Sequence, residues 1–281
     1  MRVLSLFSGG GLGDYGLTLA GMEIVGQVEI DDYCQKILSL RWPEVPKWRD
    51  IRDVKGSEVL EKCGSVDLIS GGFPCQPFSV AGGREGSEDE RFLWGEMHRV
   101  ICEVKPRWVL AENVTGLLSI DAGRTFGRVL RDLAESGYRI WWDCIPANAL
   151  GAPHRRDRVW IVAHAISERC DERTNKSRKK RKAIGGGISS VCSKVVADSN
   201  GIGLEKCGNE GSGEEVYSLW TSNQDWNACS SRTWWKSEPN VGRVAHGTPK
   251  RMDRLKLLGN GQVVQVVEWI GKRIMEFDRQ H

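Results

Sequence analysis

The sequence contains no apolar run that approaches the roughly 18 residues of a membrane-spanning helix. Its first seven residues lead at once into glycines, which is not the pattern of a secretory signal peptide. A strong excess of one charge is also absent, since 40 Lys and Arg against 37 Asp and Glu leave a formal net charge of +3. So small a charge creates no global field. We therefore expect no membrane partner, and any nucleic-acid site has to be a local basic patch.

Metal-binding and disulfide signatures are missing as well. The nine cysteines include no CxxC pair and no zinc-type spacing, so the sequence predicts no metal site. Their odd number argues against a disulfide framework and favours a reducing environment. We therefore expect a cytoplasmic protein.

Residues 1–165 alternate between short apolar runs and amphipathic segments. This alternation predicts an α/β fold with a doubly wound, mostly parallel sheet and helices on both faces. The run at 108–111 is continuously apolar, as buried parallel strands are. The expected strands are 3–7, 24–29, 66–70, 108–111, 138–146 and 158–164, and the expected helices are 31–41, 91–104 and 124–136.

The composition changes at about residue 166. Residues 166–245 are rich in Gly, Ser, Asn and charge, which predicts a small irregular domain or a long functional insertion. Helical patterns return at 248–258 and 262–276, and the apolar stripe of the second is expected to pack back onto the α/β core. We thus predict a discontinuous domain of residues 1–165 and 246–281.

The first predicted strand ends in a glycine-rich turn, LFSGGGLGDYGL, that leads into a helix. Glycine allows a ligand to approach the backbone, and a helix start offers free N–H groups. Glu29 follows the second strand, 20 residues after Gly9, where a carboxylate can bind two ribose hydroxyls. Together they indicate a nucleoside-containing cofactor, either a dinucleotide or S-adenosylmethionine. A tight turn beside a solvated glutamate is the alternative.

A second loop, GGFPCQPFS at 71–79, follows the strand at 66–70 directly. Its glycines and prolines exclude a helix or a sheet interior, which predicts a stiff loop at the carboxyl edge of the sheet. Cys75 on this loop is a candidate nucleophile. A buried and inert thiol is the alternative.

This loop resembles the signature of the C5-cytosine DNA methyltransferases, and other motifs resemble that family in the same order. They are the glycine turn, ENV at 112–114, HRRDRVWIVA at 154–163 and RLKLLGNG at 254–261. Three features depart from the family pattern. His154 stands where glutamine is usual, Leu12 holds the last position of the usual F-x-G-x-G-G turn, and the block around Leu93 is one residue shorter.

The resemblance implies a DNA (cytosine-5-)methyltransferase that uses S-adenosylmethionine. In the family's mechanism, the cysteine that matches Cys75 adds to C6 of a cytosine flipped out of the duplex. Glu112 matches the glutamate that faces N3 and needs a proton there. Arg158 matches the arginine that faces O2, and Arg156 is its neighbour in the motif. Without the resemblance, a solvated basic strand edge is the better interpretation of these arginines.

The resemblance also implies cofactor contacts. Ile30 stands where an apolar side chain stacks on adenine, and Asp50 and Ile51 match the pair that reads the adenine amine. The complete implied set is Phe7, Gly9, Gly11, Glu29, Ile30, Asp50, Ile51, Leu93 and Asn260. Residues 80–90, after the cysteine, are a candidate gate over the flipped base. A surface loop is the alternative.

The segment 166–245 matches the family only as its variable target-recognition region. Five consecutive basic residues at 178–182 suit phosphate contacts, although a solvated loop explains them equally well. Four tryptophans of this segment can stack on bases, but a small hydrophobic core is the preferred interpretation. They are Trp220, Trp226, Trp234 and Trp235.

We therefore predict a methyltransferase of prokaryotic restriction–modification or phage type that acts as a monomer on duplex DNA. A separately acting restriction endonuclease is a candidate partner. One branch of the family methylates transfer RNA, but the CFT tripeptide typical of that branch is absent here. A catalytically silent relative is a further alternative, which the presence of both Cys75 and Glu112 disfavours.

Overall fold

The computed structural model describes residues 1–74, 93–166 and 251–280. The strands are β1 (Arg2–Leu6), β2 (Glu23–Val28), β3 (Lys47–Trp48), β4 (Leu68–Gly72), β5 (Trp108–Val114), β6 (Tyr138–Ile145) and β7 (Arg158–Ala165). The helices are α1 (Leu12–Leu19), α2 (Asp32–Arg41), α3 (Gly56–Cys63), α4 (Trp94–Val104), α5 (Arg124–Glu135), α9 (Arg251–Asn260) and α10 (Val264–Gln280).

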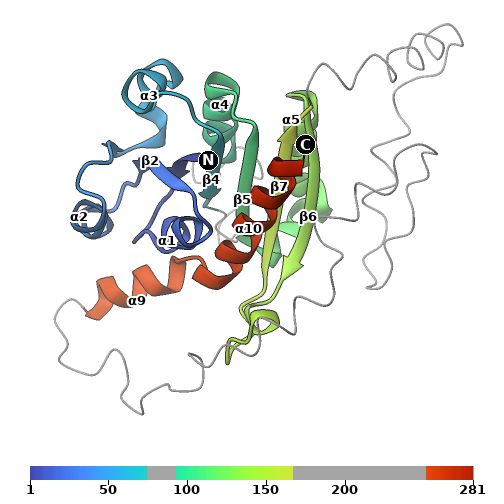
Figure 1. Ribbon diagram of the computed structural model, residues 1–281. Helices are drawn as coiled ribbons and strands as arrows, with labels where there is room; N and C mark the ends of the chain where they lie inside the picture. Colours follow the sequence, from blue (N-terminus) through green and yellow to red (C-terminus); the bar gives the residue numbers. More distant parts are fainter. Residues whose placement is uncertain (75–92, 167–250, 281) are drawn as a thin grey trace, which may run out of the picture.

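The strands form one sheet in the order β3-β2-β1-β4-β5-β7-β6 (Figure 1). Neighbours from β3 to β5 run parallel, whereas β7 is antiparallel to both β5 and β6. The chain order reverses at β1, which lies between β2 and β4. In open α/β sheets, ligands bind at the carboxyl ends of the strands beside such a switch point.

Successive side chains of the central strands enter two hydrophobic cores, one on each face of the sheet. In β5, Trp108 and Leu110 pack with α1 and α10, while Val109 and Ala111 pack with α3, α4 and α5. Because side chains alternate along a strand, an apolar run without a polar gap is the expected sequence for a strand covered on both faces.

Helix α10 returns to the first helix of the chain and lies along the sheet (Figure 1). The two helices approach closely at two glycines. A Cβ at Gly16 would lie 2.6 Å from the carbonyl oxygen of Val264, and one at Gly271 would lie 2.8 Å from the Cβ of Ala20. The predicted return of the C-terminal helix to the α/β core is therefore found in the structure.

The predicted α/β class with helices on both faces is confirmed, with boundary shifts of a few residues. Asp31 caps α2 as expected, since its Oδ1 accepts hydrogen bonds from the N–H groups of Tyr33 and Cys34 at 2.9 and 3.1 Å. Strand β3 and helix α3 were not predicted. The former has only two residues, and the latter begins at a glycine without a capping side chain.

The described ranges contain neither a membrane-spanning helix nor a metal-binding cluster. No helix in them combines the length and the apolar character that crossing a membrane requires. The same ranges contain no cluster of three or more His, Cys, Asp or Glu side chains placed to hold a metal ion.

Candidate active site

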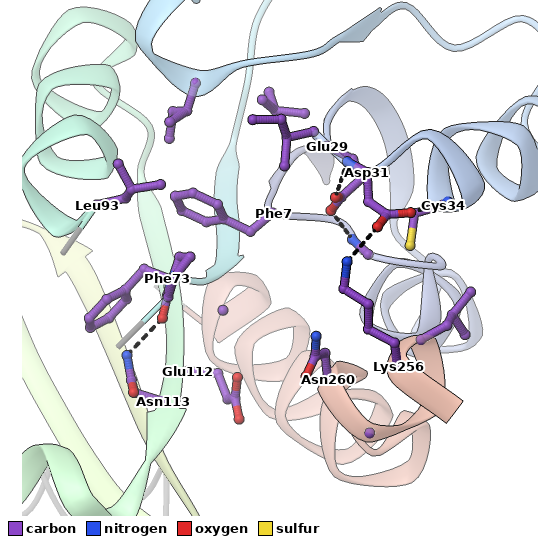
Figure 2. A pocket seen from close by; sticks show the side chains of 18 of the residues that line it. Phe7, Glu29, Asp31, Cys34, Phe73, Leu93, Glu112, Asn113, Lys256 and Asn260 are labelled. Carbon is purple, nitrogen blue, oxygen red and sulfur yellow. Dashed lines mark hydrogen bonds and ion pairs between the residues drawn. The ribbon is translucent and has the colours of Figure 1, made fainter. Parts of the chain in front are cut away.

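A pocket of about 640 Å³ opens at the carboxyl ends of β1, β2, β4 and β5, and α9 contributes a further wall (Figure 2). Its size is typical of sites for small molecules. Ten of the predicted site residues line it together: Phe7, Gly9, Glu29, Ile30, Asp50, Ile51, Leu93, Glu112, Arg158 and Asn260.

The glycine turn leaves β1 with three residues in the left-handed region. Phe7, Gly9 and Gly11 have φ values of 55°, 55° and 77°. A Cβ at Gly9 would meet no heavy atom within 4 Å, so a ligand can approach the backbone there. A Cβ at Gly11 would lie 2.5 Å from the ring of Trp42. Gly9 therefore serves the pocket, whereas Gly11 serves the packing of the turn against α2.

Glu29, at the end of β2, holds the glycine turn in place. Its carboxylate accepts the N–H groups of Gly9 at 2.7 Å and of Asp31 at 2.8 Å. A carboxylate has about four acceptor positions, so capacity is left for ligand hydroxyls. The next residue, Ile30, lines the same pocket and is 60% exposed, as an apolar surface for a flat ring has to be.

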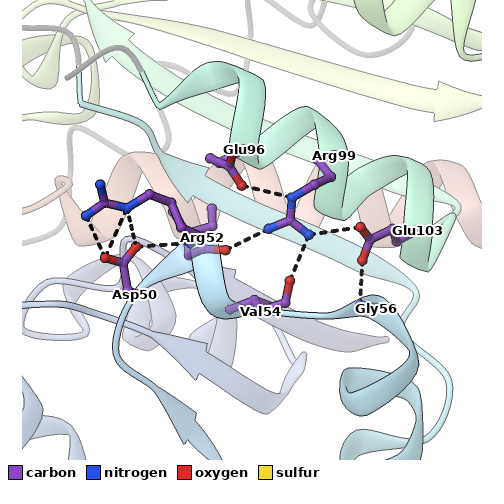
Figure 3. A network of polar contacts seen from close by, with 8 residues as sticks. Asp50, Arg52, Val54, Gly56, Glu96, Arg99 and Glu103 are labelled. Carbon is purple, nitrogen blue, oxygen red and sulfur yellow. Dashed lines mark hydrogen bonds and ion pairs between the residues drawn. The ribbon is translucent and has the colours of Figure 1, made fainter. Parts of the chain in front are cut away.

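The segment around Asp50 is anchored from α4 (Figure 3). Asp50 accepts hydrogen bonds from the backbone N–H of Arg52 at 3.0 Å and from its guanidinium at 2.7 Å. These bonds hold the pKa of Asp50 below its usual range. Arg99 on α4 donates to the carbonyls of Ile51 and Val54, both at 2.8 Å. Two glutamates of α4 fix the arginine in turn. The short 3₁₀ turn Ile51–Asp53 is thereby held at the pocket wall.

Glu112 forms the most deeply buried charged part of the pocket. Its Oε1 lies 2.9 Å from Nε of Arg158 on the antiparallel neighbour β7, and the residue is 8% exposed. Burial raises the pKa of Glu112, and Arg158, Arg156 and a hydrogen bond from Gln262 oppose the rise. A carboxyl with a raised pKa in a pocket is suited to hold a proton and donate it to a ligand.

Asn113, the middle residue of ENV, fixes the start of the cysteine loop. Its side chain is buried and donates to the carbonyl of Phe73 at 2.9 Å (Figure 2). Phe73 and Pro74 line the pocket beside Glu112. Cys75 is the next residue of the chain and lies outside the described residues.

Arg156 is not among the residues that line the pocket. It adopts a φ of 38° and donates to the carbonyls of Gly259 at 2.5 Å and of Gly261 at 2.8 Å. It thereby ties the HRRDR segment to the end of α9. Lys256 on α9 pairs with Asp31 at 2.7 Å, next to Glu29 and thus beside the glycine turn (Figure 2).

Asn113 and Lys256 belong to two of the sequence motifs, but no role was predicted for either side chain. The signal for Asn113 is a polar residue at the end of a buried strand. Gln262, directly after LGNG, was also missed, and its position in the chain carries no signal without the structure. The predicted gate at 80–90, the basic run at 178–182 and the four tryptophans lie outside the described residues.

Residues 1–236 match a family model described as the C-5 cytosine-specific DNA methylases. The chain belongs to this family. Its relatives include the type II methyltransferase M.PspPI of Psychrobacter sp., which is 40% identical over 57% of this chain and 38% of its own length. The orphan methyltransferase M.Rho11sI of Bacillus phage rho11s is 35% identical over 58% of this chain and 32% of its own length. The matched segment thus spans less than two fifths of either relative.

The fold is also found among solved structures. The crystal structure of the S. pombe Dnmt2 methyltransferase superposes with a TM-score of 0.58 at 20% identity, and the match covers 98% of both chains. This likeness confirms the predicted methyltransferase-type sheet. Membership of the family implies S-adenosylmethionine as methyl donor. The pocket fits that molecule, because an open glycine backbone, a carboxylate and an exposed apolar side chain lie together in a space of suitable volume.

Proposed function

We propose that the chain is a DNA (cytosine-5-)methyltransferase that transfers the methyl group of S-adenosylmethionine to C5 of a cytosine in duplex DNA. One observation carries the proposal. A glycine turn held by Glu29 and the buried Glu112 with its partner Arg158 line a single pocket. The segment that leads to Cys75 lines it as well.

The proposed roles follow from the chemistry of the cytosine ring, in which C5 is a poor nucleophile. The Cys75 thiolate forms a bond to C6, and the displaced π electrons move through the ring to N3. N3 takes the proton of Glu112, and Arg158 donates a hydrogen bond to O2. The result is an enamine whose nucleophilic carbon is C5. Arg156 keeps these groups in register through the carbonyls it binds at the end of α9.

S-adenosylmethionine, when bound, supplies an electrophilic methyl group. Transfer of this group to C5 would release S-adenosylhomocysteine. The C5 proton then leaves to solvent, expulsion of the Cys75 thiolate restores the aromatic ring, and N3 returns its proton to Glu112. The thiolate has to approach C6 perpendicular to the ring, so the cytosine must leave the stacked duplex.

The proposed cofactor site is the glycine-turn side of the pocket. Glu29 binds the ribose hydroxyls, Ile30 stacks on the adenine, and Asp50 with Ile51 reads its amine. Phe7, Gly9, Leu93 and Asn260 complete the walls, and Gly11 acts by shaping the turn.

We assign residues 166–245 to target recognition and residues 1–165 with 246–281 to the catalytic domain. The basic run at 178–182 is then a phosphate contact of the recognition region. If so, neutralising it reduces the salt dependence of DNA binding, whereas an unchanged slope assigns it to a solvated loop. We further propose that the enzyme acts as a cytoplasmic monomer, with any restriction endonuclease as a separate protein.

The test is incubation of the full chain with tritiated S-adenosylmethionine and either duplex DNA or transfer RNA. Label in duplex DNA that is lost in Cys75→Ser supports the proposal. Label confined to transfer RNA overturns the choice of substrate, and methylation by Cys75→Ser overturns the covalent mechanism. Bisulfite sequencing of DNA from expressing cells then gives the target sequence.

A further inference from the structure

The side chain of Gln262, between α9 and α10, occupies space left by two glycines. A Cβ at Gly13 would lie 2.1 Å from its Oε1. A Cβ at Gly72 would lie 3.3 Å from its Nε2 and 2.7 Å from Oε2 of Glu112. The amide therefore passes between the first turn of α1 and the end of β4 and reaches the Glu112 carboxyl.

The amide of Gln262 lies beside the Glu112 carboxyl, outside the pocket lining, and lowers the pKa of that carboxyl. Arg158 holds Oε1 of the same carboxyl from β7. Two partners on different elements restrict rotation of the carboxyl, whereas one partner leaves it free to turn. A neutral amide offers both a donor and an acceptor, so it can bond to the carboxylate and to the protonated acid.

The backbone that carries Gln262 is fixed on both sides. Arg156 donates to the carbonyl of Gly261 at 2.8 Å, and the N–H of Gly261 donates to the carbonyl of Leu257 at 3.0 Å. A Cβ at Gly261 would lie 2.3 Å from Leu12, so the leucine fills the space over this glycine. Leu12 thus packs over Gly261, and Gly13 leaves room for the side chain of Gln262. This gives a physical reason for the departure of the glycine turn from the family pattern.

We propose that Gln262 is a positioning residue that orients the Glu112 carboxyl and couples it to the glycine turn through the space left by Gly13 and Gly72. The inference rests on the proposed function and adds to it a residue that touches neither substrate nor cofactor. It predicts that the proton chemistry of Glu112 changes when the amide is removed, while cofactor binding does not.

The test replaces Gln262 by methionine, which keeps the length of the side chain and removes its hydrogen bond. Losing a donor to the carboxylate raises the pKa of Glu112, so the basic limb of the pH–rate profile for methylation moves up by about one pH unit. Affinity for S-adenosylhomocysteine stays within about twofold. Gln265→Met, three residues along on α10, is the matched control and leaves both quantities unchanged.

Gly13→Ala is a second variant, which displaces the amide without removing it. Alanine favours a helix more than glycine does, so this variant is expected to fold, and it moves the pH–rate profile in the same direction. A readout independent of activity is the carbon NMR titration of the Glu112 carboxyl, which is assigned by its loss in Glu112→Gln. Its midpoint rises in Gln262→Met.

The results of these experiments distinguish a positioning role of Gln262 from a purely structural one. A profile and a carboxyl titration identical to those of the wild type overturn the inference. So does a loss of rate that tracks the melting temperature and cofactor affinity without a shift in pH, because a purely structural role predicts that result. A wild type that methylates neither nucleic acid refutes the proposed function instead, and the NMR titration still decides whether Gln262 acts on Glu112.

Discussion

Two walls face the same pocket, and their carboxylates have different partners. On the glycine-turn wall, Glu29 accepts the backbone N–H groups of Gly9 and Asp31. On the other wall, Glu112 is buried beside the guanidinium of Arg158 and the neutral amide of Gln262. Burial raises the pKa of Glu112. Backbone donors suit a carboxylate that binds hydroxyls, whereas a buried carboxyl suits proton transfer. The two tasks should therefore be separable by mutation.

A third carboxylate shows that a raised pKa alone does not identify a catalytic group. Asp14 lies beneath the glycine turn, where burial raises its pKa to about 6. Ser5 and Gln27 donate to it at 2.5 and 2.6 Å, and the residue is 2% exposed. Asp14 is thus sealed by its neighbours, while Glu112 lines the pocket. The two carboxyl groups therefore differ in their access to a ligand, although burial raises the pKa of both.

The largest expected effect is that of Glu112→Gln on the methylation rate. The amide keeps the shape of the side chain but has no acidic proton, so the rate falls by about 10²–10⁴-fold. Cofactor affinity, measured by calorimetry with S-adenosylhomocysteine, stays within about twofold because the glycine-turn wall is intact. A variant that loses both in proportion would show that the two walls do not have separate tasks.

Asp14→Asn tests the sealed carboxylate through stability. The folded pKa of about 6 exceeds the unfolded value of 3.8, so the stabilisation from Asp14 is complete below pH 3.8 and is lost as the pH rises through 6. The asparagine stays neutral. Gln27 Oε1 has no hydrogen-bond partner among the described residues. The amide of Gln27 can therefore turn so that this oxygen accepts a hydrogen bond from the NH₂ group of the new asparagine.

The measurement is urea unfolding at a series of pH values. As the pH rises from 3.8 through 6, the free energy of unfolding of the wild type should fall relative to that of Asp14→Asn by about 3 kcal/mol. Asp53→Asn, at an exposed position, is the control and should run parallel to the wild type. A difference between wild type and Asp14→Asn that does not change with pH would contradict the assignment.

Local patterns predicted most of this framework. The continuous apolar run in β5 and the apolar stripe on α10 indicate burial by themselves, because a strand covered on both faces, or the covered face of a helix, must be apolar. The two-residue β3 has no measurable period. The antiparallel pairing of β7 with β5 was not visible either, since pairing is decided by contacts between segments far apart in the chain.

The site divides in the same way. Glu29 and Glu112 could be found because each stands at the end of a recognisable strand within a motif. The partners that set their behaviour could not. Gln262 lies 150 residues after Glu112 in the chain, and the glycine at position 13 leaves room for the side chain of Gln262, which comes from the segment between α9 and α10. The orientation of Arg156 toward the end of α9 has the same long-range origin.

Glu29→Gln should affect binding more than chemistry. The amide oxygen can accept a hydrogen bond but its nitrogen cannot, so either Gly9 or Asp31 loses its partner. Hydrogen bonds to charged groups contribute about 1.5–3 kcal/mol, which predicts a loss of cofactor affinity of at least about tenfold. Glu23→Gln, at the exposed start of β2, is the matched control. At saturating cofactor the methylation rate should recover, and a rate that stays low would assign Glu29 a part in the chemistry.

The smallest expected effect is that of Lys256→Met. The pair of Lys256 and Asp31 joins α9 to α2 beside the glycine turn, but the lysine side chain is 65% exposed. Exposed pairs contribute little, so cofactor affinity should fall by about two- to threefold at low salt, and the difference should vanish as salt screens the charges. Lys272→Met removes the equally short pair with Glu268 on α10, away from the pocket, and should leave affinity unchanged. If Lys256→Met instead reduced the methylation rate at saturating cofactor, α9 would serve the Glu112 wall as well. The two walls would then not have fully separate tasks, because α9 contributes to both of them. It lines the pocket, and Arg156 binds the carbonyl of Gly259 near its end.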